Sequence, residues 1–215
     1  MHALVMRWRG PLMSLAGARI DGYAQQMAIP SLTMVAGMLA AALGYRRGDP
    51  RIEALADALH FGVVVHKPGT PLVDFQTADL AIIGMQRAVV DRHGTVRIVK
   101  REGSGAAKDR QMQYRPLLAD GDMSVVASVA APWTAPQLLQ ALRTPVFPLC
   151  LGRQSCPAGG QVGEHVIEAS SLEAALDAVR SERGGTVYRP VAGLVDGLVV
   201  SVPSRGRGAT LFAVE

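Results

Sequence analysis

The expected fold is built around one helical segment, Pro30-Ser31-Leu32-Thr33-Met34-Val35-Ala36-Gly37-Met38-Leu39-Ala40-Ala41-Ala42-Leu43-Gly44. Proline and serine stand where a helix begins, and glycine stands where it ends. The small residues between them allow the helix to approach a sheet closely. We therefore expect a helix over 32–43 that packs on a sheet.

The segments on both sides of this helix alternate between strand and helix patterns. We expect further helices over 51–59, 135–142 and 171–183. We expect strands over 3–8, 61–66, 123–129, 146–151, 187–188, 198–202 and 209–214, and a loop over 14–29. The order of the first elements is strand, helix, strand, hairpin, strand, helix, strand. It predicts an α+β, ferredoxin-like (RRM-like) βαββαβ body with an insertion, a scaffold that many RNA-binding domains use.

The insertion is strongly basic. Residues 86–115 hold eight basic and three acidic side chains, which gives +5 against +4 for the whole chain. Two strand-like runs, 88–90 and 95–99, flank the turn Asp91-Arg92-His93-Gly94, which is typical of a hairpin. We interpret this segment as a basic β-hairpin arm that projects from the body and suits phosphate contacts. The alternative is an ordinary surface hairpin with solvated charges.

No motif for catalysis, metal binding or cofactor binding stands out, so we expect no metal and no cofactor. A metal-independent ribonuclease would need a cluster of side chains such as His93, Lys100 and Tyr114. The sequence alone does not show whether these residues meet in space. The start of the chain has no secretory signal pattern, and the longest apolar run, 34–43, is too short to span a membrane. We expect a cytoplasmic protein that does not contact a membrane and binds rather than catalyses.

A second informative segment is Phe147-Pro148-Leu149-Cys150-Leu151-Gly152-Arg153-Gln154-Ser155-Cys156-Pro157. It is an apolar run that breaks at glycine into an exposed Arg-Gln-Ser turn and stops at proline. We expect the two cysteines to pack in the interior. The turn therefore presents one arginine, either for a ligand or for a carboxylate of the same chain.

Five blocks of this sequence occur in the order found in a known family. They are Gly10-Pro11-Leu12-Met13-Ser14, the 30–44 segment, Asp74-Phe75-Gln76-Thr77, Arg115-Pro116-Leu117-Leu118-Ala119-Asp120-Gly121, and Leu151-Gly152-Arg153-Gln154-Ser155-Cys156-Pro157. The chain resembles the Cas-five family of CRISPR-associated proteins, in particular the CasD subunit of type I-E Cascade. It departs from the family pattern at six positions, as a divergent member would: Met13, Leu15, Leu32, Thr33, Met34 and Gln76.

The resemblance implies a ferredoxin-like body with a β-hairpin thumb. We expect the body over 1–157 with the thumb inserted at about 78–114, and a small β-rich extension over 158–215 packed on the body. It also implies a non-catalytic antiviral subunit that binds the 5′ handle of the guide RNA. Its partners would be the backbone subunit and the large subunit that reads target DNA. The alternatives are an endoribonuclease, as in type I-C relatives, and a pure protein-interaction module.

The residues expected at the RNA share polar or cationic side chains within or near these blocks. We expect Arg115 and Arg153 to bind phosphates, together with backbone amides at the start of the 32–43 helix. The supporting residues are Gln154, Ser31, Thr33, Gln76, Thr77, Arg101, Lys108 and Arg110.

Overall fold

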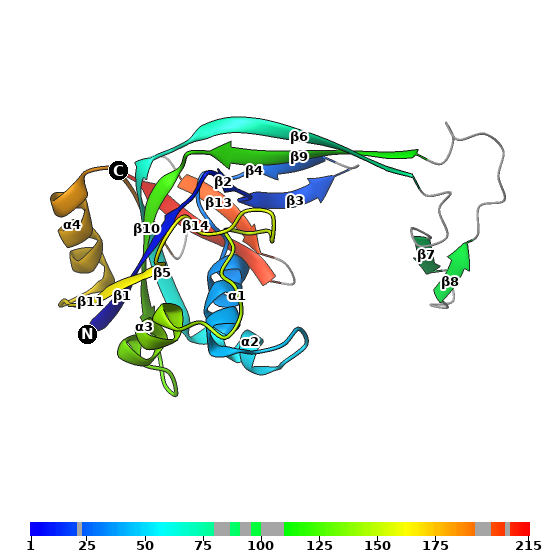
Figure 1. Cartoon of the computed structure of the whole chain (residues 1–215). Helices are drawn as coiled ribbons and strands as arrows, with labels where there is room; N and C mark the ends of the chain where they lie inside the picture. The colour runs from blue at the N-terminus through cyan, green and yellow to red at the C-terminus, as the bar shows by residue number, and fades with distance from the viewer. Residues whose placement is uncertain (21–22, 80–86, 91–95, 100–109, 192–198, 205–206) are drawn as a thin grey trace.

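A mixed α+β architecture with antiparallel sheets is seen in a computed structural model of the chain (Figure 1). The structure describes all residues except 21–22, 80–86, 91–95, 100–109, 192–198 and 205–206. A seven-stranded sheet forms the centre of the body, and every neighbouring pair of its strands is antiparallel. Its strands, in spatial order, are β11 (Gly163–Glu168), β1 (His2–Arg9), β10 (Asp122–Val129), β5 (Leu59–Lys67), β12 (Thr186–Val191), β14 (Arg207–Val214) and β13 (Val199–Ser204).

The central strands are buried on both faces because helices cover both. Along β1, Leu4, Met6 and Trp8 join the larger hydrophobic core, whereas Ala3 and Val5 join the smaller one. This alternation follows from the two-residue period of a strand. The larger core lies under α1 (Leu32–Leu43), α2 (Arg51–Ala58) and α3 (Ala135–Arg143), and the smaller core lies under α4 (Leu172–Arg183).

The helices begin and end near the expected residues. Gly44 ends α1 with a φ of +79°, and its backbone N–H reaches the carbonyls of Ala40 and Ala41. Ser171 starts α4, where its hydroxyl accepts a hydrogen bond from the N–H of Ala174. Among the described residues, no helix is both long and apolar enough to cross a membrane.

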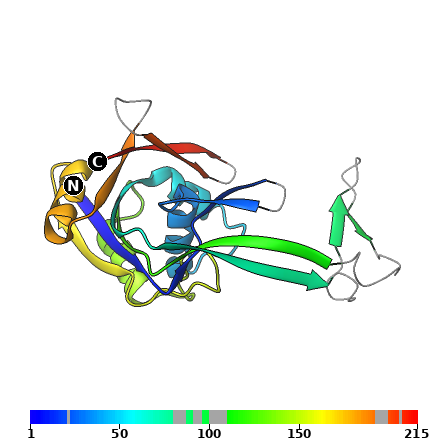
Figure 2. The same cartoon turned by 90° about the horizontal axis from the view of Figure 1, so that it is seen from above.

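A second sheet carries a long two-stranded ribbon. The sheet contains β2 (Leu12–Met13), β9 (Arg110–Ala119), β4 (Tyr23–Gln26) and β3 (Ala16–Ile20), and β6 (Thr70–Asp79) pairs with β9 over ten residue pairs. We call the paired strands β6 and β9 the ribbon. Figures 1 and 2 show the ribbon extending from the body toward the small hairpin of β7 (Arg87–Val90) and β8 (Val96–Val99).

Two expectations about local structure are wrong. The segment 14–29 is not a loop, because it contains β3 and β4, and β4 finds a partner in β9 through the pair Tyr23 and Tyr114. The segment 146–151 is not a strand. The N–H groups of Val146 and Phe147 instead donate to carbonyls in the last turn of α1.

The strand on the outer side of β1 is β11. It follows residue 157, so the seven-stranded sheet runs across the expected division between body and extension. The three C-terminal strands continue the same sheet, because β12 pairs directly with β5.

Candidate nucleic-acid interface

The Arg-Gln-Ser turn is a tight hairpin whose ends are anchored in the core. Leu151 donates its backbone N–H to the carbonyl of Cys156 at 2.7 Å, and both side chains are fully buried. Gly152 has a φ of +94°, a conformation that side-chain-bearing residues rarely adopt. Gln154 is exposed, whereas Arg153 is half-buried and has an interaction partner in the fold. Both ends of the turn are therefore held by buried residues.

The two cysteine side chains pack in the fold, but they are buried to different extents. Cys156 is buried as expected, but Cys150 is half-buried and pairs across the hairpin with Pro157. Because Leu151 pairs with Cys156 in the same hairpin, the two thiols belong to opposite faces. Burial raises the pKa of the Cys150 thiol, which disfavours the reactive thiolate.

The turn docks on the segment between β1 and β3 and on α1. The N–H of Ser14 donates to the carbonyl of Leu151 at 2.9 Å. A Cβ atom placed on Gly152 would lie 2.1 Å from the carbonyl oxygen of Ser14 and 2.9 Å from Cε of Met34. Only glycine allows this approach, so the turn, the 10–14 segment and the first turn of α1 meet at one place.

The start of α1 is polar and carries no negative charge. Ser31 precedes the helix in an extended conformation, and its hydroxyl lies 3.0 Å from that of Thr33 rather than capping the helix. The first turn contains no acidic residue. The N–H groups at a helix start carry a partial positive charge that favours an anion.

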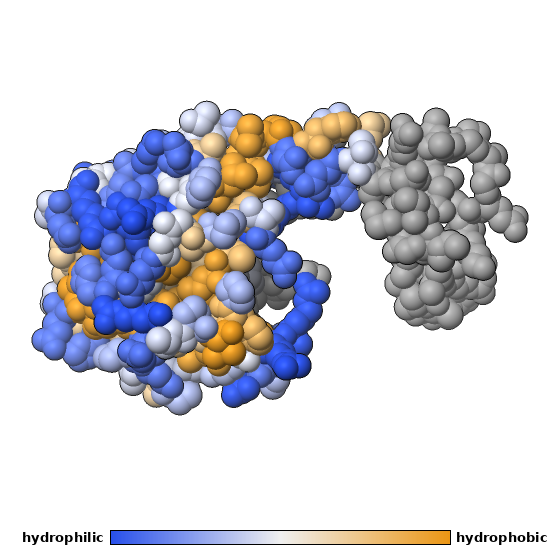
Figure 3. Space-filling view, in the orientation of Figure 1, coloured by the Kyte–Doolittle hydropathy of each residue, from blue (hydrophilic) through white to orange (hydrophobic). Residues whose placement is uncertain are grey.

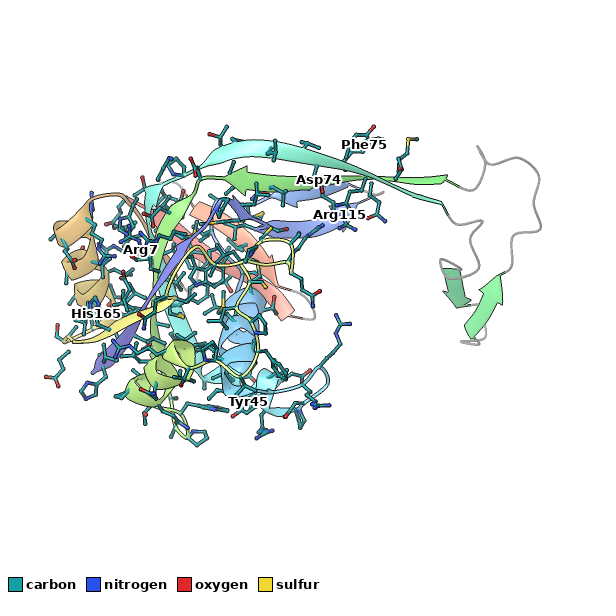
Figure 4. The ribbon with its side chains drawn as sticks, viewed as in Figure 1. Arg7, Tyr45, Asp74, Phe75, Arg115 and His165 are labelled. Atoms are coloured by element: carbon teal, nitrogen blue, oxygen red, sulfur yellow. The ribbon has the colours of Figure 1, made fainter. Side chains whose placement is uncertain are left out.

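One face of the ribbon is polar. Arg115 lies opposite Asp74, and Gln113 lies opposite Gln76. The Arg115 guanidinium donates to Oε1 of Gln113 at 3.1 Å, and Gln76 donates to the Asp74 carboxylate at 2.5 Å. Arg115 makes no ion pair with any residue that the structure describes. Figure 4 shows Arg115 on the underside of the ribbon.

The ribbon joins the turn through β2. Met13 pairs with Leu118 of β9, and Ser14 contacts the turn. Arg115 is three residues from Leu118 along the strand, which corresponds to about 10 Å. The 10–14 segment, the start of α1 and the Arg153 turn therefore meet at the Gly152 contact. The blocks that contain Gln76 and Arg115 connect to it through the pairing of β2 with β9.

The remaining expected residues are not brought to this place. Thr77 belongs to the opposite face of the ribbon from Gln76, because successive residues of a strand alternate. Arg110 lies at the far end of β9, opposite Asp79 in the backbone register of the ribbon. Arg101, Lys108, His93 and Lys100 lie outside the described residues.

Sequence reasoning missed Arg9 and Gln113. The backbone carbonyl of Arg9 accepts a hydrogen bond from Gly159 at 2.8 Å, and its exposed guanidinium lies against Gly160. The available signal was a cation directly before the Gly10-Pro11 block. By contrast, Arg7 is structural. It forms ion pairs with Asp122 and Glu164, and the hydrogen bond with Asp122 raises the pKa of Arg7.

The site thus combines an anchored turn, a helix start and arginines. No cluster of three or more metal-ligating side chains occurs in the part of the chain that the structure describes. These features make this part of the α+β scaffold a candidate surface for an anionic partner.

Comparisons with known proteins identify the family. The sequence model described as "CRISPR-associated protein (Cas_Cas5)" matches residues 3–207. The chain belongs to this CRISPR-associated Cas5 family. A search of curated proteins gives no match.

Two solved structures are similar over almost the whole chain. A chain of a "CRISPR RNA-guided surveillance complex" is 25% identical with a TM-score of 0.67, and the match covers 99% of this chain and 89% of that one. A second structure, "Crystal structure of Cas protein", is 23% identical with a TM-score of 0.61, and covers 99% and 92%.

Proposed function

We propose that this chain is a non-catalytic subunit of a type I-E-like Cascade complex that binds the 5′ handle of the guide RNA. Its protein partners are the backbone subunit and the large subunit of that complex. The protein is cytoplasmic, and it acts on target DNA only indirectly, through the complex. Family membership and the similarity to a chain of an RNA-guided surveillance complex support this assignment.

We also propose a ferredoxin-like body with a thumb. The neighbouring strands β11, β1, β10 and β5, connected through α1 and α3, support the βαββαβ body. The projecting ribbon supports the thumb.

The observation that carries the function is the contact of Gly152 with Ser14 and Met34. It holds the Arg153 turn beside the first turn of α1, so an arginine-bearing turn and a polar helix start lie in one region. Single-stranded RNA is recognised by such combinations of phosphate contacts and polar groups near splayed bases. Arg115 adds a second cation on the polar face of the ribbon, which joins this region through the pairing of β2 with β9.

The experiment measures binding of a 5′-handle RNA oligonucleotide by fluorescence anisotropy. Arg115→Ala and Arg153→Ala should each weaken binding roughly tenfold or more, because a hydrogen bond to a charged group is lost. Arg180→Ala, which removes an exposed cation from α4 on the other side of the sheet, is the matched control and should bind normally. Equal affinity of all four proteins would reject the site.

The ribonuclease alternative is tested with the same protein. The isolated chain is incubated with a repeat RNA hairpin in a chelator, and the RNA length is followed by electrophoresis. Our proposal predicts intact, bound RNA. Cleavage that disappears in Tyr114→Phe would instead support the enzyme.

A further inference from the structure

Arg9 is the last residue of β1, and its backbone is held in place while its side chain is exposed. Its carbonyl accepts a hydrogen bond from the N–H of Gly159 at 2.8 Å. A Cβ atom placed on the next residue, Gly10, would lie 3.0 Å from the carbonyl oxygen of Pro157. The absence of a side chain at Gly10 lets the two segments pass this close. Arg9 is therefore fixed against the residues that follow the Arg-Gln-Ser turn.

The charge of Arg9 is not neutralised by the residues around it. Arg7 and Arg9 point to the same face of β1, because they are two residues apart on a strand. Asp122 lies opposite Arg9 in the register of β1 and β10, but its carboxylate forms an ion pair with Arg7, as does that of Glu164. Arg9 itself forms no ion pair with any residue that the structure describes.

The guanidinium of Arg9 contacts an exposed segment that contains glycine. A Cβ atom placed on Gly160 would lie 3.3 Å from Nη2 and 3.6 Å from Nε of Arg9. Residues 159–161 are exposed, and the N–H groups of Gly160 and Gln161 donate no hydrogen bond to a described residue. The two segments that meet here, 8–20 and 144–163, contain arginines and no acidic residue. Arginines and backbone N–H groups are the usual ligands of nucleic-acid phosphates.

We propose that Arg9, together with the backbone of residues 159–161, binds a phosphate of the guide RNA other than the phosphate assigned to Arg153. The inference rests on the proposed function, because its ligand is the RNA of that function. The Arg-Gln-Ser turn leads directly into residues 159–161, so Arg153 and the Arg9 contact lie at the tip and at the exit of one continuous segment. Guanidinium suits this task because it can form two parallel hydrogen bonds to a phosphate.

The position of Arg9 also connects it with Arg115. Arg9 precedes β2 by three residues, and β2 pairs with β9, the strand that carries Arg115. Figure 3 shows hydrophilic surface beneath the ribbon, on the side where Figure 4 shows Arg115. An RNA strand bound to this part of the molecule would thus use Arg9 as a third cation, at a phosphate of its own.

The test is a scan of the handle RNA with one neutral methylphosphonate linkage at a time, read by fluorescence anisotropy with the full chain. The linkage that Arg9 binds should lower the affinity of the parent protein roughly tenfold, because a hydrogen bond to a charged group is lost. The same linkage should have no further effect in Arg9→Ala, since that contact is already absent. It should differ from the linkage that has no further effect in Arg153→Ala.

The unmodified RNA provides the second readout. We expect Arg9→Ala to bind it roughly tenfold more weakly, with a slope of log affinity against log salt concentration that is shallower by about 0.7. Arg9→Lys should keep the slope of the parent protein, because the charge remains, but should bind more weakly because the planar fork is lost. Arg180→Ala, which removes an exposed cation from α4, is the matched control and should equal the parent protein in both quantities.

Three results would overturn the inference. In the first, Arg9→Ala has the affinity and the slope of the parent protein. In the second, the silent linkages of Arg9→Ala and Arg153→Ala coincide, so both arginines share one phosphate. In the third, Arg9→Ala binds RNA normally but fails to join the complex, which would assign Arg9 to a carboxylate of a protein partner. If Arg115→Ala and Arg153→Ala weaken RNA binding and Arg9→Ala does not, this inference alone fails; if the parent protein does not bind the handle RNA, the proposed function fails with it.

Discussion

Replacing Gly152 with alanine tests the contact that holds the Arg153 turn in place. The φ of +94° is unfavourable for any residue with a Cβ atom, which costs about 1–2 kcal/mol. The new Cβ would also lie 2.1 Å from the carbonyl oxygen of Ser14. Optimal contacts of this kind lie near 3.5 Å, so the turn or the 10–14 segment must move by more than about 1 Å.

Displacement of well-packed atoms costs roughly 1–3 kcal/mol in addition. We therefore expect Gly152→Ala to lower the free energy of unfolding by roughly 2–5 kcal/mol. Ordinary domain stability is about 5–15 kcal/mol, so a domain above the lower end of that range remains folded after such a loss and its RNA binding can still be measured.

Gly48→Ala provides a matched control. Gly48 has a φ of +89°, but no heavy atom lies within 4 Å of a Cβ placed there. Gly48→Ala should lower the free energy of unfolding only by the cost of the backbone conformation, about 1–2 kcal/mol. Its RNA affinity should not change. The assay is urea denaturation followed by circular dichroism, together with anisotropy titration of the handle RNA. If the two variants lose equal stability and both bind RNA like the parent protein, the reasoning about the turn is refuted.

Two further predictions concern groups outside the interface. Ser171→Ala removes the hydroxyl that accepts from the N–H of Ala174 and should lower the free energy of unfolding by about 1 kcal/mol in the same urea assay; an unchanged midpoint would contradict the assigned cap. Hydrogen bonds from Arg51 lower the pKa of the half-buried Asp49 carboxyl. Because that pKa is lowered on folding, any associated stabilisation is present at neutral pH and is lost as the pH falls through the folded-state pKa. Arg51→Ala should raise the pKa of Asp49 toward its ordinary value in an NMR titration, and an unchanged pKa would show that another group is responsible.

Local signals predicted α1 well, and long-range pairings explain the errors. The proline, serine and glycine around α1 act within a few residues of it, so its bounds were predicted correctly. The strands β3 and β4 were missed because glycine and polar residues suggested a loop, whereas distant β9 supplies the pairing for β4. The 146–151 segment has strand-like composition, but its first N–H groups donate hydrogen bonds to carbonyls of α1 instead of pairing with a strand.

For the candidate site, the sequence suggested individual residues but not their geometry. Glycine and proline around Arg153 indicated an exposed turn, and the family pattern singled out Arg115. Nothing local indicates that Gly152 contacts Ser14, because the two are far apart in sequence. The separation of the ribbon into two faces likewise depends on a register that sequence alone does not fix.

The salt dependence of handle-RNA affinity tests the central claim most directly. Each phosphate contact to single-stranded nucleic acid contributes about 0.7 to the slope of log affinity against log salt concentration. If Arg115 and Arg153 each bind a phosphate, the double variant Arg115→Ala/Arg153→Ala should give a slope shallower by about 1.4 than that of the parent protein. A double variant with the slope and the affinity of the parent protein would contradict the account.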